Sequence, residues 1–80
     1  MAAVQLGLVY LEYFLLAVSL QPADQQLRMG LGDCYARLNR LPEAQAQYRE
    51  AVRLAEQDLQ AAPGDGAMTS MLILNLAKAG

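Results

Sequence analysis

The sequence predicts an all-α fold, four antiparallel helices in one small domain of 80 residues. Large apolar residues recur three and four positions apart, which is the spacing of one helix face. Three proline-containing breakers, at 21–24, 39–42 and 62–66, divide the chain into four such segments. No segment alternates apolar and polar residues as a strand does. We therefore expect helices over 3–20, 24–39, 42–61 and 66–79.

The first helix is expected from a run of 17 residues, 4–20, that holds a single charge, Glu12. A membrane-spanning helix is the weaker alternative, because it needs about 20 apolar residues. A carboxylate near the centre of such a span also costs about 2.5–3.5 kcal/mol. We therefore expect a buried amphipathic helix, and we expect a membrane to be no partner.

The second helix is expected to begin at Asp24, because Pro22 cannot continue the first helix and an aspartate can cap the free amides of the next one. Asn39 tolerates the left-handed turn that ends it. One face of this helix is apolar, through Leu27, Leu31, Cys34, Tyr35 and Leu38.

The third helix is expected to start at Pro42, which suits a first helical position. Its apolar stripe consists of Ala44, Tyr48, Ala51, Val52, Ala55 and Leu59, and its other face is charged. The fourth helix follows the breaker at 62–66, with apolar residues at Met68, Met71, Leu72, Leu74 and Leu76.

Composition excludes several classes of function. The chain has no His, one Cys and no Trp, so metal ligands and catalytic triads are lacking, and we expect no enzyme activity, cofactor or metal. A net charge of −2 without a basic patch excludes a nucleic-acid partner. Cys34 lies on an apolar face and is expected to be a small buried hydrophobe. No export signal is visible, so a cytoplasmic location is expected.

Two internal offsets reveal a repeat. An offset of 34 residues aligns 14–20 with 48–54, so that aromatic, Ala, Val and Leu positions coincide, and an offset of 41 aligns Leu31 and Arg37 with Leu72 and Lys78. The central segment resembles the tetratricopeptide repeat family, whose motif is W-x2-L-G-x2-Y, then A-x3-F, then P. The residues that carry this resemblance are Leu31, Gly32, Tyr35, Ala44 and Tyr48, followed by Leu72, Ile73 and Leu76 at the Leu, Gly and Tyr positions of a further unit.

The resemblance implies an α-solenoid piece: 1–23 ends a preceding unit, 24–65 is one full unit, and 66–80 begins another. Gly32 and Ala44 would let the two helices of the full unit approach closely while Tyr35 and Tyr48 fill the space beside them. Arg28 stands where the family has Trp, which is expected to leave that edge exposed. Residues 55–61 are an insertion of about two helical turns, so the third helix is expected to project beyond its neighbours.

The resemblance also implies function, which is binding of a peptide or protein in the concave groove formed by the first helix of each unit. The residues that would line this groove are Gln26, Met29, Asp33, Ala36 and Arg37, then Ala67, Ser70, Leu74 and Lys78. Arg37 and Lys78 would stand one repeat apart and favour an acidic peptide, or they are simply solvated helix ends. The family's Lys/Asn carboxylate clamp is absent, because Met29 and Asp33 occupy its places.

The alternative function is structural assembly. The first and fourth segments carry one charge each, Glu12 and Lys78, and the first has too many apolar residues for a single stripe. End helices of a repeat array need a polar outer face to stay soluble. We therefore expect these end helices to be covered by another copy of the chain or by a partner protein, with lipid as the weaker alternative.

Overall fold

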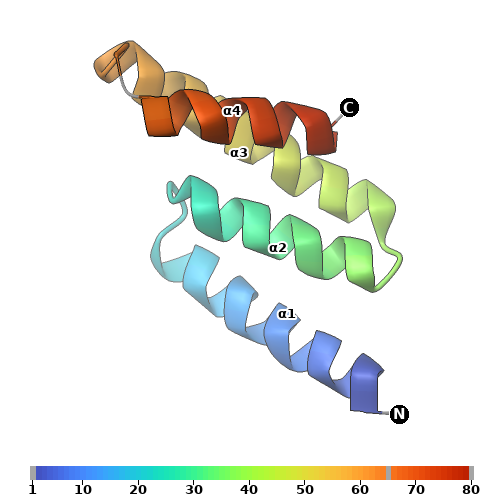
Figure 1. Cartoon of the computed structure of the whole chain (residues 1–80). Coiled ribbons are helices and arrows are strands. Elements are labelled where there is room, and N and C mark those ends of the chain that lie inside the picture. Colours follow the sequence, from blue (N-terminus) through green and yellow to red (C-terminus); the bar gives the residue numbers. More distant parts are fainter. Residues whose placement is uncertain (1, 65, 80) are drawn as a thin grey trace.

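A computed structural model describes residues 2–64 and 66–79, and these residues are all-helical, as predicted. The four helices are α1 (Ala2–Leu20), α2 (Gln25–Arg37), α3 (Leu41–Ala61) and α4 (Gly66–Ala79). Each predicted boundary lies within two residues of the observed one. Successive helices run in opposite directions and follow one another across the molecule (Figure 1).

The turns are formed by the residues that the sequence singled out. Asp24 is the N-cap of α2, and its Oδ1 accepts hydrogen bonds from the backbone N–H groups of Gln26 (2.9 Å) and Leu27 (3.1 Å). Asn39 has a positive φ of 60°, the left-handed conformation that ends a helix. Pro42 lies in the first turn of α3, where its missing N–H costs no hydrogen bond.

Helix α2 is packed on both sides, and each side uses a glycine. A Cβ atom at Gly30 would clash with the Phe14 ring of α1. A Cβ at Gly32 would lie 2.6 Å from Cε1 of Tyr48 on α3. Each glycine therefore leaves the space that an aromatic ring of the neighbouring helix occupies. This close packing accounts for the presence of glycine inside a helix, where it is otherwise unfavourable.

The hydrophobic core consists of the side chains buried between α1 and α2 and those buried by α3. Between α1 and α2, the buried side chains are Leu11, Val18, Leu31 and Cys34, with Phe14, Leu27, Tyr35 and Leu38 packed against them. Helix α3 buries Ala44, Tyr48, Ala51, Leu54 and Ala55, of which four were predicted. Small alanines in this row let neighbouring helix backbones come close.

Arg28 does not leave the edge of α2 open, contrary to expectation. Its side chain is half-buried, its Nε donates to the carbonyl oxygen of Pro22 (3.1 Å), and its Nη1 donates to Oε1 of Gln47 (3.1 Å). Arginine's several donors therefore connect the turn before α2 to α3, in the place where the family has an apolar ring.

The predicted apolar face of α4 is wrong in part. Met71 and Leu72 are half-buried, but Leu74 and Leu76 are exposed. Asn75 is fully buried, and Ile73 is 62% exposed. The side chain of Met68 lies outside the described residues. Helix α4 packs mainly on α3, and Lys78 on its inward side also forms an ion pair with Asp33 of α2. Because a helix turns about 100° per residue, Asn75 and Lys78, three positions apart, share this inward side, whereas Ile73 lies on the opposite side.

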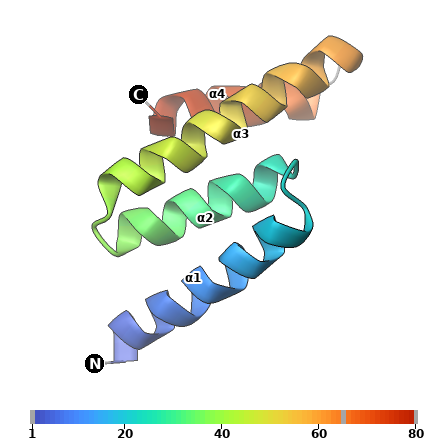
Figure 2. The ribbon, with the colours of Figure 1, turned by 180° about the vertical axis from the view of Figure 1, so that it is seen from behind.

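The molecule is elongated rather than rounded, and α4 lies over α3 (Figures 1 and 2). Its principal dimensions are 45 × 26 × 18 Å, and its radius of gyration of 13.1 Å exceeds the roughly 12 Å of a compact domain of this length. Helix α1 forms one edge, and the last turns of α3 extend past the start of α2, as predicted (Figures 1 and 2). Within the described ranges, no helix is both long and apolar enough to cross a membrane.

The first prediction concerns the crossing of α2 and α3. We expect Gly32→Leu to lower the free energy of unfolding by about 1–3 kcal/mol or more, because its side chain must displace the Tyr48 ring. The matched control is Gly64→Leu, since a Cβ at Gly64 has open space around it. Thermal unfolding followed by circular dichroism measures both variants. An unchanged melting temperature for Gly32→Leu would show that this contact does not form.

The second prediction concerns Asn75. Its amide nitrogen and oxygen are buried without a hydrogen-bond partner among the described residues, and such a group costs about 1–3 kcal/mol. Leucine has the same branched shape without polar atoms, so we expect Asn75→Leu to raise the melting temperature. Ser70→Leu, at an exposed position of the same helix, is the control for added apolar surface. A lower melting temperature for Asn75→Leu would mean that the amide makes a stabilising hydrogen bond.

Candidate partner-binding surface

Of the nine residues predicted to line the groove, the seven that are not alanine divide into two groups. Gln26, Arg37, Ser70 and Leu74 are exposed, and Met29, Asp33 and Lys78 are half-buried. Two of them meet across the molecule: Nζ of Lys78 lies 2.9 Å and 3.1 Å from the two carboxylate oxygens of Asp33. The last turn of α4 therefore touches α2 at Asp33.

Asp33 has a second partner from α3. The Tyr48 hydroxyl donates to Asp33 Oδ1 at 2.5 Å, and Lys78 Nζ lies 5.6 Å from the centroid of the Tyr48 ring. We name these three side chains, Asp33, Tyr48 and Lys78, the three-helix cluster. The cluster occupies Lys78 within the fold, so Lys78 is not a free cation beside Arg37 on the wall.

The cluster also changes the acidity of Tyr48. Burial of the phenol, followed by its hydrogen bond to Asp33 and the charge of that carboxylate, raises the pKa of Tyr48 well above its ordinary value. The hydroxyl therefore keeps its proton at neutral pH and can donate it to Asp33.

A hollow of about 260 Å³ lies beside the cluster, between α1 and α2. We call it the aromatic hollow; its lining residues are Tyr10, Phe14, Gly30, Asp33, Cys34 and Arg37. The aromatic rings give it an apolar wall, and the exposed Arg37 gives it a cationic rim. Asp33 and Arg37 were predicted as binding residues, whereas Tyr10 and Phe14 were not. Their spacing of four on one helix is the signal that could have identified them.

Cys34 does not supply a nucleophile to the aromatic hollow. Its thiol is buried, and burial raises its pKa, with Arg37 opposing this shift and Asp33 adding to it. A thiol that stays protonated packs as a small apolar group. Among the described residues, no three Cys, Asp or Glu side chains are placed to hold a metal ion.

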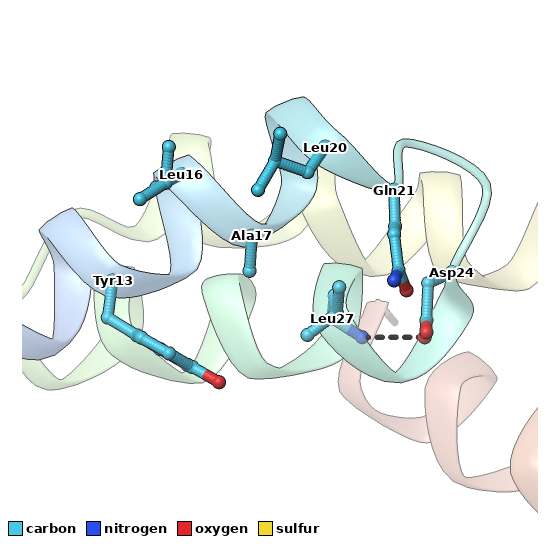
Figure 3. A pocket seen from close by; sticks show the side chains of 7 residues that line it. All are labelled: Tyr13, Leu16, Ala17, Leu20, Gln21, Asp24 and Leu27. Carbon is cyan, nitrogen blue, oxygen red and sulfur yellow. Dashed lines mark hydrogen bonds between the residues drawn. The ribbon is translucent and has the colours of Figure 1, made fainter.

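A second hollow, of about 330 Å³, lies where α1 turns into α2 (Figure 3). We call it the turn hollow; its lining residues are Tyr13, Leu16, Ala17, Leu20, Gln21, Asp24 and Leu27. Its walls are mainly apolar. Asp24 contributes a carboxylate at one end, and this group already caps α2 through the amide of Leu27, as Figure 3 shows.

Neither hollow is lined by Gln26, Met29, Ser70 or Leu74. Of the predicted residues, Asp33 and Arg37 thus line the aromatic hollow. Lys78 contacts the hollow only through its ion pair with Asp33. Those four residues lie outside both hollows. Comparison of the chain with protein-family models, with curated proteins and with solved structures found no match.

The third prediction tests the three-helix cluster by its pH dependence. Because the pKa of Tyr48 is raised in the folded state, the unfolded chain loses this proton first as the pH rises past about 10. The stability contributed by the protonated phenol is therefore complete below about pH 10 and is lost above it. We expect the melting temperature to fall more steeply between pH 9 and 11 for the wild-type chain than for Tyr48→Phe. Equal slopes for the two proteins would exclude Tyr48 as the group responsible.

Proposed function

We propose that this chain is a non-catalytic protein-interaction module of the helical-repeat kind, which binds a peptide or protein segment at the aromatic hollow. The observation that carries the proposal is the composition of this hollow, where Asp33 and Arg37 lie beside Tyr10 and Phe14. The resemblance to tetratricopeptide repeats supports the same face of α2 as the binding surface. Aromatic and arginine side chains are the residue types that contribute most to binding at protein interfaces.

The charges around the hollow favour an acidic ligand. Asp33 is paired with Lys78, and the positive charge of Lys78 reduces the repulsion between this carboxylate and an acidic ligand. Arg37 remains exposed on the rim. An aliphatic side chain would enter between the two rings, and a neighbouring carboxylate would pair with the Arg37 guanidinium. The ligand class is thus a short segment in which an apolar residue adjoins Asp, Glu or a C-terminal carboxylate.

A fourth prediction follows for Arg37. The probe is a labelled peptide enriched by selection of a displayed library of random 12-residue peptides on the full chain, and its affinity is measured by fluorescence anisotropy. We expect Arg37→Glu to weaken binding at least tenfold, or about 1.4 kcal/mol, because it reverses the charge at the rim. Arg49→Glu makes the same change at an exposed position of α3 outside the hollow and should leave the affinity unaltered.

Two further results bear on this proposal. The enriched peptides should share an apolar residue next to an acidic one, and their binding should weaken as salt is raised, since the pair with Arg37 is exposed. If Arg37→Glu and Arg49→Glu weaken the affinity for the peptide equally, binding depends on the net charge of the chain and not on the hollow, which would contradict the proposal. Failure to enrich any peptide at this face would contradict the proposed function.

A further inference from the structure

Helix α1 carries two apolar stripes, and α2 covers one of them. The inner stripe packs against α2 through Gly7, Leu11, Phe14 and Val18. The outer stripe lies on the opposite side of the helix, and its members expose between 56% and 73% of their surface: Leu6, Val9, Tyr13, Leu16 and Leu20. Helix α1 forms the edge of the molecule in both views, and no described element lies beyond it (Figures 1 and 2).

The spacing of the outer stripe is that of a seam between two helices. Its residues follow one another by three, four, three and four positions, which is the heptad pattern that keeps one face toward a partner helix. A flat protein surface or an extended peptide requires no such period. The stripe therefore fits another helix along its whole length.

We propose that the outer stripe of α1 binds the same stripe of a second copy of this chain across a twofold axis. Tyr13 lies at the midpoint of the stripe, with Leu6 and Leu20 each seven residues away, so two copies overlap fully when their Tyr13 residues meet. The stripe itself carries no charge that would select a partner of opposite charge. Twofold interfaces of this self-complementary kind are the commonest in soluble oligomers.

The exposed area is sufficient for such a dimer. A fully exposed large apolar or aromatic side chain presents on the order of 100–200 Å², and five of them are more than half exposed on each copy. Two stripes together bury on the order of 1,000 Å², which is about the minimum for a specific interface.

The turn hollow is continuous with the stripe. Tyr13, Leu16 and Leu20 belong to both, and the hollow of about 330 Å³ has room for side chains from the second copy. Burial of an apolar anchor in a pocket is the arrangement that gives an interface most of its affinity. A twofold dimer would fill two such hollows, one on each copy.

A lipid surface fits the stripe less well than a second copy does. Helices that lie on membranes combine an apolar face with Lys and Arg on the polar face. Helix α1 has no basic residue, its one charge is Glu12, and the whole chain has a net charge of −2. Attraction to anionic headgroups is therefore lacking.

The dimer is independent of the proposed peptide site. No residue lines both the aromatic hollow and the outer stripe. A dimer would carry two peptide sites, and a failure of either proposal leaves the other in place.

The experiment measures the mass of the full chain by light scattering and sedimentation in detergent-free buffer over a range of concentrations. We expect twice the 8.7 kDa of one chain. Leu16→Glu should halve the mass while the helical circular dichroism is kept. The matched control is Ile73→Glu on α4, since both side chains are 62% exposed, and it should remain dimeric.

A cross-link locates the interface directly. Tyr13→Cys should form a disulfide-linked dimer on mild oxidation, whether the two helices run parallel or antiparallel, because residue 13 is the midpoint in both arrangements. The wild-type chain is the control, since its single thiol, Cys34, is buried. A monomer at high concentration, loss of the dimer in Ile73→Glu, or no cross-link at position 13 would each overturn the proposal. Dissociation of the dimer onto anionic phospholipid vesicles would overturn it in favour of a lipid surface.

Discussion

The contact between Gly32 and the Tyr48 ring is the constraint on which the rest of the structure depends. Glycine inside a helix costs about 1 kcal/mol relative to alanine, and here its missing side chain is the space that the ring occupies. The ring then positions its hydroxyl on Asp33, and Asp33 holds Lys78. The close approach of α2 and α3 thus also places the Asp33 carboxylate within reach of Lys78, while α4 packs mainly on α3.

This arrangement leaves apolar and aromatic side chains on the surfaces to which we assign the two proposed interactions. This small, elongated molecule buries few side chains, so aromatic and aliphatic groups of α1 remain at its edge. Some of these side chains line the aromatic hollow beside Arg37, and others form the uncharged outer stripe. Two different recognition tasks can therefore share one helix, because they use different sides of it.

The features that could be predicted from the sequence are those that depend on residues close together in the chain. Asp24 and Asn39 act through their own backbone neighbourhood, so both turns were predictable from residue type. The stripe of α3 was predictable because one face of that helix is apolar and the other is charged. The face of α4 was not predictable, since nearly every position there is apolar and the rotation of the helix depends on its contacts with α3 and with the distant Asp33. Tyr10 and Phe14 were missed for a related reason: their hollow exists only where Gly30 of another helix makes room.

The packing of each helix mainly on its neighbours in the chain has a consequence for how the molecule forms. The turns that join consecutive helices are short, so each pair closes a short loop at a small entropic cost. Folding dominated by such nearby contacts is fast, and any helical pair can begin it. The ion pair between Asp33 and Lys78 joins residues 45 positions apart, so closing it carries a larger loop-entropy cost than the contacts between consecutive helices. Helix α1, attached through α2 alone among its principal contacts, is the part that can open while the other three helices stay together.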